Sequence, residues 1–401
     1  MSHSNGRKAL VVGLGISGMA TAIRLHQAGW SPTIVERARS RRTGGQFIGL
    51  FGPGQAAARR LGFLDAMPDR SVPGGVTYTV NRAGRRRAGL GVPDLPGENR
   101  FMMRSDVERA AFEALPADVE IRYGTSPTRI EQDASGVDVT LERAGAQQAE
   151  RFDLVVGADG LRSTVRRLAF GPHQRYLRRL GVMVATFTLP APIGGYERDS
   201  AGLFEPGRAM WTFPFVDHPP TALFLYRTTD VDAEFTGRPA DRVRAAFGPQ
   251  APGPLLGEAL AALDTADEIV FDSLEQVDLE TWSCGRVVLV GDSAWCLTLF
   301  AGLGVSAGLA GADLLGTMLQ RHPEDVGTAL RAWENHLRPH IAGYQRSGRE
   351  PLVFMPGDER EMALRQLMAH ALKLPVLADV VRHFALGRSE REDRLDIARV
   401  H

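Results

Sequence analysis

The sequence predicts a mixed α/β protein with a parallel-sheet domain, a second domain built on an antiparallel sheet, and a C-terminal helix. Short apolar runs that end in glycine, at residues 9–12, 153–157 and 287–290, are typical of strands buried on both faces. Apolar and small residues at helical spacing follow the first and last of these runs. Between residues 178 and 229 the pattern changes to strands separated by turn residues, which indicates an antiparallel sheet.

The first 36 residues predict one βαβ unit. Residues 9–12 form the first strand, residues 19–25 place alanines and branched apolar residues at helical spacing, and residues 32–36 form the second strand. Gly29 ends the helix between them. Because a βαβ crossover joins parallel strands, the unit implies a parallel sheet.

The segments after this unit alternate between turn-rich and helical patterns. Residues 44–54 contain too much glycine for one regular element, and a helix is expected at residues 55–61. Residues 71–98 are strand-like and interrupted by glycine and proline. A helix is expected over residues 105–115, with Ser105 as its N-cap and Glu108 completing a capping box.

The second half of the chain predicts three strands and two helices. The strands are expected at residues 181–187, 209–213 and 221–226. A long apolar helix is expected over residues 305–319. Apolar residues at helical spacing predict a last helix within residues 361–386, and Pro375 interrupts it; the spaced residues are Leu364, Leu367, Met368, Leu372 and Leu374.

Composition excludes several classes of protein. The chain has 401 residues, of which 44% are hydrophobic and 23% charged, and its formal net charge of zero argues against nucleic acid as a partner. Its two cysteines form no CxxC pair, so neither a zinc site nor a disulfide scaffold is expected. The N-terminus lacks the features of a signal peptide, and no apolar run is long enough to span a membrane. A cytoplasmic protein without stable membrane association is expected.

Residues 13–18, GLGISG, form a GxGxxG motif in the context that nucleotide binding requires. Gly13 permits a tight turn after the strand, Gly15 lets a pyrophosphate approach the backbone, and Gly18 lets the strand and helix pack closely. The helix N-terminus adds unpaired N–H groups and the positive end of the helix dipole. Glu36, at the end of the second strand, is placed to accept hydrogen bonds from a ribose diol. The motif, its βαβ context and Glu36 together predict a dinucleotide site.

Two later motifs distinguish FAD from NAD. Residues 153–166, DLVVGADGLRSTVR, resemble the Asp-Gly fingerprint of flavoprotein aromatic hydroxylases, and residues 285–294, GRVVLVGDSA, resemble their Gly-Asp fingerprint. With GxGxxG they occur in the family's order, at spacings of roughly 140 and 130 residues. The chain therefore resembles a class A FAD-dependent monooxygenase of the para-hydroxybenzoate hydroxylase fold over essentially its whole length. It also resembles actinobacterial tailoring hydroxylases and tetracycline-inactivating monooxygenases, which share a similar glycine loop.

This resemblance implies a discontinuous Rossmann-like FAD-binding domain of the GR2 type. The expected FAD-binding residues are Gly13, Gly15, Ile16, Ser17, Gly18, Glu36, Arg37, Arg104, Asp159, Asp292, Gly302, Leu303, Gly304 and Val305. In the family, the aspartate that matches Asp292 binds the ribityl chain, and the following helix points its N-terminus at the pyrimidine end of the flavin. Arg104 matches an arginine near the flavin, and residues 44–54 match a loop beside its ring.

The same resemblance implies the domain boundaries. The FAD-binding domain is expected at residues 1–72, 99–176 and 278–345, the substrate-binding β-sheet domain at residues 73–98 and 177–277, and a C-terminal helical segment at residues 346–401.

The implied reaction is oxygenation, most often hydroxylation, of an aromatic or polycyclic small molecule in secondary metabolism. NADPH or NADH binds transiently and reduces the flavin, and O₂ then forms a flavin C4a-hydroperoxide that transfers oxygen to the substrate. Trp211, Phe213 and Phe215 alternate along one strand and so face one side, where they line either the substrate pocket or ordinary core. No catalytic residue and no metal ligand is assigned; His218, His336 and His340 are unassigned candidates. A monomer or homodimer is expected.

Four alternatives use the same type of domain. A flavin-dependent halogenase needs a Trp-x-Trp-x-Ile-Pro motif and a catalytic lysine, and neither occurs at a suitable place in this chain. A Baeyer–Villiger enzyme with two dinucleotide motifs needs a second GxGxxG, which is absent. A non-oxygenating FAD-dependent dehydrogenase or reductase remains the main alternative, and a flavin-binding protein without turnover is another.

The Gly-Asp loop departs from the family at three positions. Trp295 occupies a place where the family usually has histidine or tyrosine, Leu299 a place where it has proline, and Ser306 a place where asparagine is frequent. Since proline fixes φ and removes an N–H, whereas leucine does neither, the loop is expected to differ in shape at the edge of the flavin that reacts with oxygen.

Overall fold

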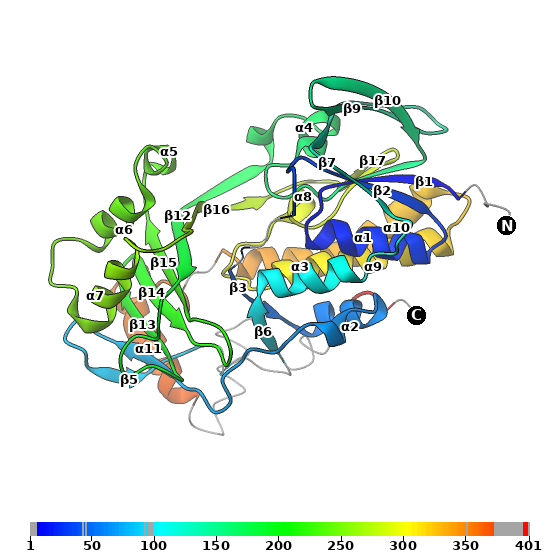
Figure 1. The fold of residues 1–401 in the computed structure, drawn as a ribbon. Coiled ribbons are helices and arrows are strands. Elements are labelled where there is room, and N and C mark those ends of the chain that lie inside the picture. The colour runs from blue at the N-terminus through cyan, green and yellow to red at the C-terminus, as the bar shows by residue number, and fades with distance from the viewer. Residues whose placement is uncertain are drawn as a thin grey trace.

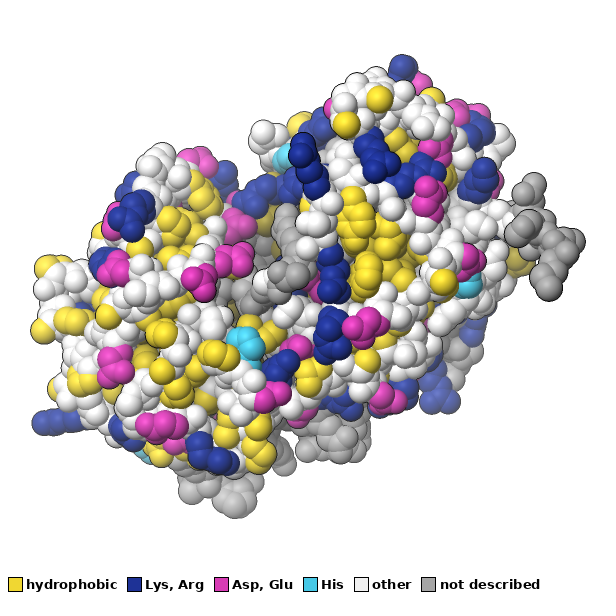
Figure 2. Space-filling view, in the orientation of Figure 1, with side chains coloured by type: hydrophobic (Ala, Val, Ile, Leu, Met, Phe, Trp, Pro, Cys, Tyr) yellow, Lys and Arg dark blue, Asp and Glu magenta, His cyan; other side chains and the backbone are white. Residues whose placement is uncertain are grey.

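The protein is built as two lobes, each around its own sheet (Figure 1). The computed structural model describes residues 6–41, 44, 46–91, 94, 99–349, 352–372 and 396–399. Basic and acidic side chains are intermixed over the face that Figure 2 draws, in keeping with a net charge of zero.

The first lobe is organised by a six-stranded sheet in the order β17-β18-β11-β1-β2-β7. Its strands are β1 (Lys8–Val12), β2 (Ser31–Glu36), β7 (Glu120–Tyr123), β11 (Leu154–Gly157), β17 (Ser283–Cys284) and β18 (Val287–Leu289). All neighbours pair in parallel except the edge pair β17–β18. Leu10, Val155 and Val288 are completely buried because both faces of this sheet are covered. The predicted parallel sheet is therefore confirmed.

Helices cover one face of this sheet and a small sheet covers the other (Figure 1). The helices are α1 (Ile16–Gln27), α3 (Arg104–Glu113), α9 (Gly304–Arg321) and α10 (Val326–Ser347). The small antiparallel sheet contains β8 (Thr125–Gln132), β9 (Val137–Arg143) and β10 (Ala146–Phe152). Helices α1 and α9 approach closely because glycines face α1: a Cβ on Gly308 would lie 2.4 Å from Ser17 Oγ, and one on Gly316 would lie 2.5 Å from Arg24 Cγ.

The second lobe contains a seven-stranded sheet in the order β16-β12-β15-β14-β13-β4-β5. The strands are β4 (Thr77–Val80), β5 (Arg86–Ala88), β12 (Leu177–Thr188), β13 (Ser200–Glu205), β14 (Arg208–Phe213), β15 (Thr221–Arg227) and β16 (Val270–Val277). The predicted antiparallel sheet is confirmed, with one exception: β4 and β13 pair in parallel. Strands β12 and β16 join the two lobes (Figure 1).

The two faces of the seven-stranded sheet have different environments. Helices α5 (Val231–Glu234), α6 (Pro239–Phe247) and α7 (Gly253–Ala262) follow β15 in the chain and lie beside the sheet (Figure 1). Met210 and Phe224 join Val243 and Phe247 in one apolar cluster. Trp211 and Phe213, pointing to the opposite face, belong to a different cluster, as the pleat of a strand requires.

A two-stranded ribbon and several short helices complete the elements that precede the C-terminal helix. The ribbon β3 (Phe47–Leu50) and β6 (Arg100–Met103) is antiparallel. The short helices are α2 (Gly52–Arg60), η1 (Leu64–Ala66), α4 (Thr164–Ala169), η3 (His173–Arg175) and α8 (Asp292–Trp295).

The capping box predicted for α3 is wrong. The helix begins at Arg104, so Met103 is its N-cap and Asp106 occupies the position from which a side chain caps the backbone. Asp106 accepts a 3.0 Å hydrogen bond from the Met103 N–H. Glu108 instead accepts a 3.0 Å hydrogen bond from Arg104. The sequence pattern was misleading because pairing of β6 with β3 extends the preceding strand to Met103 and fixes the start of the helix there.

The predicted C-terminal helix is found as α11 (Glu359–Ala371). Its predicted continuation to residue 386, including Pro375, lies outside the described residues. Near the end of the chain, Asp396 receives a bidentate ion pair from Arg60 of α2. Among the helices of the described chain, none is both long and apolar enough to cross a membrane.

Candidate functional site

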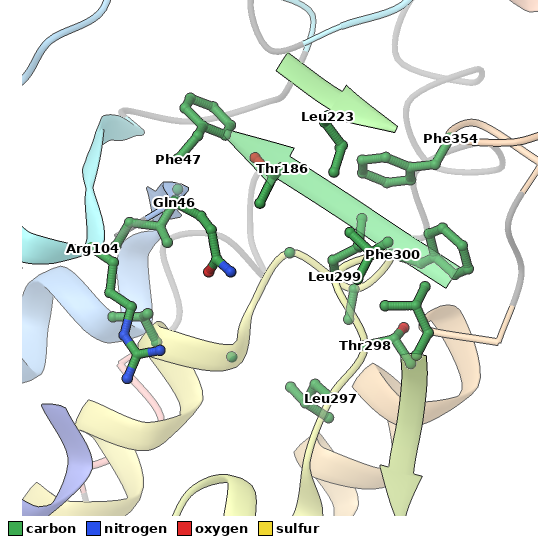
Figure 3. Close-up of a pocket in the computed structure, with 18 of the residues that line it drawn as sticks. Gln46, Phe47, Arg104, Thr186, Leu223, Leu297, Thr298, Leu299, Phe300 and Phe354 are labelled. Carbon is green, nitrogen blue, oxygen red and sulfur yellow. The ribbon is translucent and has the colours of Figure 1, made fainter. Parts of the chain in front are cut away.

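A cavity of about 560 Å³ lies where the two lobes meet, and it combines the predicted nucleotide loops with the inner face of the seven-stranded sheet. Figure 3 shows Gln46, Phe47 and Arg104 on one side of it and Leu299, Phe300 and Phe354 on the other. The sequence-predicted residues that line it are Gly15, Ile16, Ser17, Arg104, Trp211, Phe213, Asp292, Gly302, Gly304 and Val305.

The three glycines of GxGxxG serve different purposes in the structure. Gly13 has φ +108°, and its Cβ would lie 2.6 Å from the Ala158 carbonyl oxygen, so only glycine fits. A Cβ on Gly18 would lie 1.9 Å from the Gly13 oxygen. Gly15 is different: its φ is −82°, and a Cβ there would have no atom of the described chain within 4 Å. Since neither conformation nor protein packing requires glycine at 15, the open space in front of it fits a closely approaching ligand.

Two helix N-termini meet at the cavity. Helix α1 begins beside Gly15 and α9 begins with Gly304 and Val305, all of which line the cavity. Within the described residues, neither helix has a side-chain hydrogen bond at its N-cap. Their free N–H groups and positive dipole ends therefore favour an anionic ligand.

Glu36 lies beside the same loop, although it does not line the cavity. Its Oε2 accepts from the Leu14 N–H at 2.9 Å and its Oε1 from the Ala38 N–H at 2.8 Å. Each carboxylate oxygen can accept a further bond, so Glu36 retains capacity for a ribose diol. Arg37 is exposed beside it.

Asp159 supports the loop between β11 and α4, which belongs to the Asp-Gly motif. Its Oδ2 accepts from Thr164 N–H at 2.6 Å and Val165 N–H at 3.1 Å, which holds the start of α4. Its Oδ1 is buried and has no hydrogen-bond partner in the described part of the chain. Burial raises the pKa of this carboxyl, opposed by the bonds that it accepts. An unpartnered buried oxygen fits a ligand or water that supplies a donor.

Asp292, the first residue of α8, and Arg104, the first residue of α3, both line the cavity. The Asp292 side chain is exposed to the cavity, and its surroundings raise the pKa of the carboxyl through loss of hydration, while the Arg104 charge opposes that shift. Arg104 stands at the first turn of α3, held by its N–H bond to the Gln46 oxygen at 2.8 Å and by Glu108. A carboxylate and a guanidinium thus converge where a polar ligand would need both an acceptor and a donor.

The loop from Gly302 to Val305 lies on the same side of the cavity as the predicted nucleotide loops. Gly302 has φ +64°, which turns the chain into α9, and its N–H bonds the Leu299 oxygen at 2.9 Å. Leu303 is buried in the core instead of lining the cavity.

Aromatic side chains form the sheet side of the cavity. Trp211 and Phe213 stack with ring centroids 5.8 Å apart, and Phe213 stacks on Phe47 at 4.4 Å. Phe215 does not line the cavity, because β14 ends at Phe213 and the alternation of a strand stops there. Phe215 packs near Phe47 instead, with centroids 5.8 Å apart.

Several cavity residues were not predicted from the sequence. They are Gln46, Phe47, Thr186, Leu223, Asp272, Leu297, Thr298, Phe300 and Phe354. Gln46 and Phe47 lie within the glycine-rich segment at residues 44–54, and the match of that segment to a loop beside the flavin ring was a signal that could have identified them. Thr186 and Leu223 lie opposite each other on paired strands, so a complete alternation analysis of those strands could have found them.

The three departures in the Gly-Asp loop have different structural outcomes. Trp295 does not reach the cavity; it packs with Trp282 at 4.8 Å and Trp333 at 5.9 Å. Ser306 is buried, and its Oγ accepts from the Phe51 N–H at 3.0 Å. Leu299 lines the cavity, as Figure 3 shows.

The histidines considered from the sequence lie elsewhere: His218 packs against Phe215, and His336 contacts His340. In the described part of the chain, no group of three or more His, Cys, Asp or Glu residues could hold a metal.

Taken together, the residues present fit FAD. The open space at Gly15 fits a pyrophosphate, Glu36 a ribose, and Asp292 a hydroxylated chain. The apolar wall beyond them accommodates an aromatic ring system.

Comparison with known proteins agrees with this fit. The family model described as "FAD binding domain" matches residues 7–332. An uncharacterised protein of Mycobacterium tuberculosis is 31% identical over 342 residues, covering 80% of this chain and 86% of the relative. A flavin-dependent monooxygenase from an unknown prokaryotic organism is 26% identical, covering 85% and 88%.

Solved structures share the fold. A tetracycline destructase, Tet(55), superposes with a TM-score of 0.77 at 23% identity, covering 97% of this chain and 99% of the other. HpxO of Klebsiella pneumoniae, solved with FAD and uric acid, superposes with a TM-score of 0.74 at 19% identity, covering 95% and 97%. The chain therefore belongs to the FAD binding domain family, and its relatives include proteins named flavin-dependent monooxygenases.

Proposed function

We propose that this FAD-dependent monooxygenase consumes NADPH or NADH and O₂ to hydroxylate, or otherwise oxygenate, an aromatic or polycyclic small molecule of secondary metabolism. One observation carries the proposal: a single cavity contains both the loops that fit FAD and an aromatic wall on a separate sheet. A flavin ring and an apolar substrate held in one cavity are the arrangement that direct oxygen transfer requires.

In this proposal the predicted nucleotide residues divide the cofactor among them. Gly13–Gly18 and the N-terminus of α1 bind the pyrophosphate, with Glu36 and Arg37 at the adenosine end. Asp292 accepts from the ribityl hydroxyls, Asp159 supports the loop beside it, and Arg104 donates to flavin oxygens. The N-terminus of α9, from Gly302 to Val305, lies where negative charge gathers on the reduced flavin.

The sheet side holds the substrate. Trp211 and Phe213 offer flat apolar surface, and Thr186 and Thr298 offer hydroxyls for orientation. Bound FAD would accept electrons from the nicotinamide and activate O₂; the chain's own residues position the substrate and exclude water. Because the lining near Leu299 and Phe300 is apolar, it favours a dry reaction site.

The test is a screen of aromatic compounds against the holoenzyme, measuring NAD(P)H consumption and hydrogen peroxide together. We expect a substrate to stimulate NAD(P)H consumption while the peroxide formed stays below the NAD(P)H consumed. The main alternative is a non-oxygenating FAD-dependent oxidoreductase. If it is a reductase, NAD(P)H is consumed without O₂ and the product is reduced; if it is a dehydrogenase, the product is oxidised and the substrate does not stimulate NAD(P)H consumption.

Arg104→Met is expected to weaken FAD retention by about 10- to 100-fold, because it removes a charged hydrogen-bond donor worth about 1.5–3 kcal/mol. Equilibrium dialysis of the purified variant against FAD measures the effect. Arg109→Met is the matched control, since Arg109 lies on the same helix with similar exposure but pairs with Asp106 and Glu113 away from the cavity. Equal FAD affinity in both variants would remove Arg104 from the cofactor site.

The proposal includes the division of the chain into an FAD-binding domain, a substrate-binding domain and a C-terminal helical segment. It is supported by the seven-stranded sheet, which draws its strands from the regions assigned to the substrate domain. The cytoplasmic location and the monomeric or homodimeric state remain predictions.

A further inference from the structure

Arg365 of α11 is a buried cation directly behind the aromatic wall of the cavity. Only 2% of its surface is exposed. Its guanidinium carbon lies 3.5 Å from the ring centroid of Phe204 and 5.4 Å from that of Trp211. Of these two rings, Trp211 lines the cavity.

The guanidinium also ties three separate chain segments together. Its Nε donates to the Val353 oxygen at 2.8 Å, one terminal nitrogen to Thr79 Oγ1 at 3.0 Å, and the other to the Leu90 oxygen at 3.3 Å. Leu90 and Val353 both line the cavity. Trp211 is fixed in turn by its Nε1–H bond to the Phe354 oxygen at 3.2 Å. The Arg365 guanidinium therefore contacts the wall in two ways: it lies over the Trp211 ring, and it donates to the backbone oxygens of Val353 and Leu90.

Burial of this charge is costly for folding. Within the described residues, its hydrogen bonds go to two carbonyl oxygens and one hydroxyl. The acidic group whose charge acts on it is Asp94, which accepts a hydrogen bond from the Gly91 N–H. Loss of hydration lowers the pKa of Arg365 to about 9, opposed by the charge of Asp94. Replacing buried ionic groups with apolar side chains often costs no stability, so packing alone does not explain a buried guanidinium at this position.

We propose that Arg365 is a positioning residue for the substrate, which fixes Trp211 and the Leu90 and Val353 segments from behind the wall and so determines how an aromatic ring is held. The inference rests on the proposed function, because it assigns this part of the cavity to the substrate. A planar guanidinium suits the task because it can stack on a ring face and donate in three directions at once. A lysine can supply the charge but not this geometry.

The test uses holoenzyme carrying Arg365→Met and 2-naphthol, a neutral bicyclic phenol, with binding followed by the change in flavin absorbance. We expect 2-naphthol to bind about 10-fold more weakly, with FAD content unchanged, because a small displacement of the wall loses aromatic contacts. Arg365→Lys should recover part of the affinity. Arg360→Met should bind like the wild type, since Arg360 is exposed on the same helix.

Two results would overturn the inference. One is a variant that keeps FAD and binds 2-naphthol as tightly as the wild type. The other is a variant that loses FAD and 2-naphthol binding together, which indicates a general structural role.

Failure of the proposed function is separable from failure of this inference. If 2-naphthol leaves the wild-type flavin spectrum unchanged, the aromatic site itself is in doubt. Hydrogen exchange then decides the role of Arg365: we expect Arg365→Met to accelerate amide exchange at residues 88–91 and 352–355 while residues 13–18 keep the wild-type rate. Unchanged exchange at both wall segments would contradict the positioning role.

Discussion

Gly13→Val is expected to yield protein without FAD and to lower the free energy of unfolding by about 2–6 kcal/mol, the sum of backbone strain and steric overlap at about 1–3 kcal/mol each. Gly13 has φ +108°, which a β-branched residue does not tolerate. Its Cβ would lie 2.6 Å from the Ala158 oxygen and 3.0 Å from Asp159 Cα, both in backbone that cannot move aside cheaply. Thermal unfolding and flavin absorbance of the purified variant measure the two effects.

Gly15→Ala is the comparison that separates folding from cofactor binding. A Cβ at Gly15 has no neighbour within 4 Å in the described chain, and the backbone there is acceptable to alanine. We therefore expect a Tm close to that of the wild-type apoprotein together with weaker FAD binding. If Gly15→Ala binds FAD normally, the pyrophosphate does not pass over this loop as proposed.

Asp292→Ala is expected to reduce FAD affinity by about 10- to 100-fold, since a hydrogen bond to a charged group contributes about 1.5–3 kcal/mol. The carboxylate faces the cavity, so its loss leaves no packing defect in the core. Removing it also removes an unfavourably placed charge, because loss of hydration inside the cavity raises the pKa of this carboxyl. The apoprotein should therefore be no less stable than the wild type, and FAD titration of the apoprotein measures the affinity.

Asp272→Ala provides the control for Asp292. Asp272 also lines the cavity, but it lies on β16 of the seven-stranded sheet and pairs with Arg162 at 2.9 Å. We expect this variant to retain FAD. Equal losses in the two variants would show a general electrostatic effect of cavity carboxylates and would argue against a specific contact at Asp292.

The nucleotide half of the site could be predicted because its signals are local. A buried strand, a glycine turn and a helix N-terminus lie within about 20 residues at each motif, and each glycine reflects a constraint from its immediate neighbours. Gly15 and Asp292 accordingly line the cavity, and Gly13 has the positive φ that its turn requires. Their contacts with FAD stay predictions.

The substrate half depends on contacts between distant segments, which periodicity does not report. Phe47, Thr186 and Phe354 meet only after three separate segments pack together. Helix α11 shows the difficulty most clearly. Leu364 and Leu367 belong to the apolar spacing that predicted this helix, yet they are 46% and 65% exposed, whereas Arg365 is buried. A buried arginine follows from its ring and carbonyl partners, and these belong to other parts of the chain.

Incorporation of ¹⁸O from ¹⁸O₂ tests the central claim most directly. The holoenzyme is supplied with NAD(P)H, ¹⁸O₂ and the compound that best stimulates NAD(P)H consumption, and the product is examined by mass spectrometry. We predict one ¹⁸O atom per product molecule and one NAD(P)H consumed for each product formed under full coupling. A product oxidised without ¹⁸O would contradict the account and identify the protein as a non-oxygenating flavoenzyme.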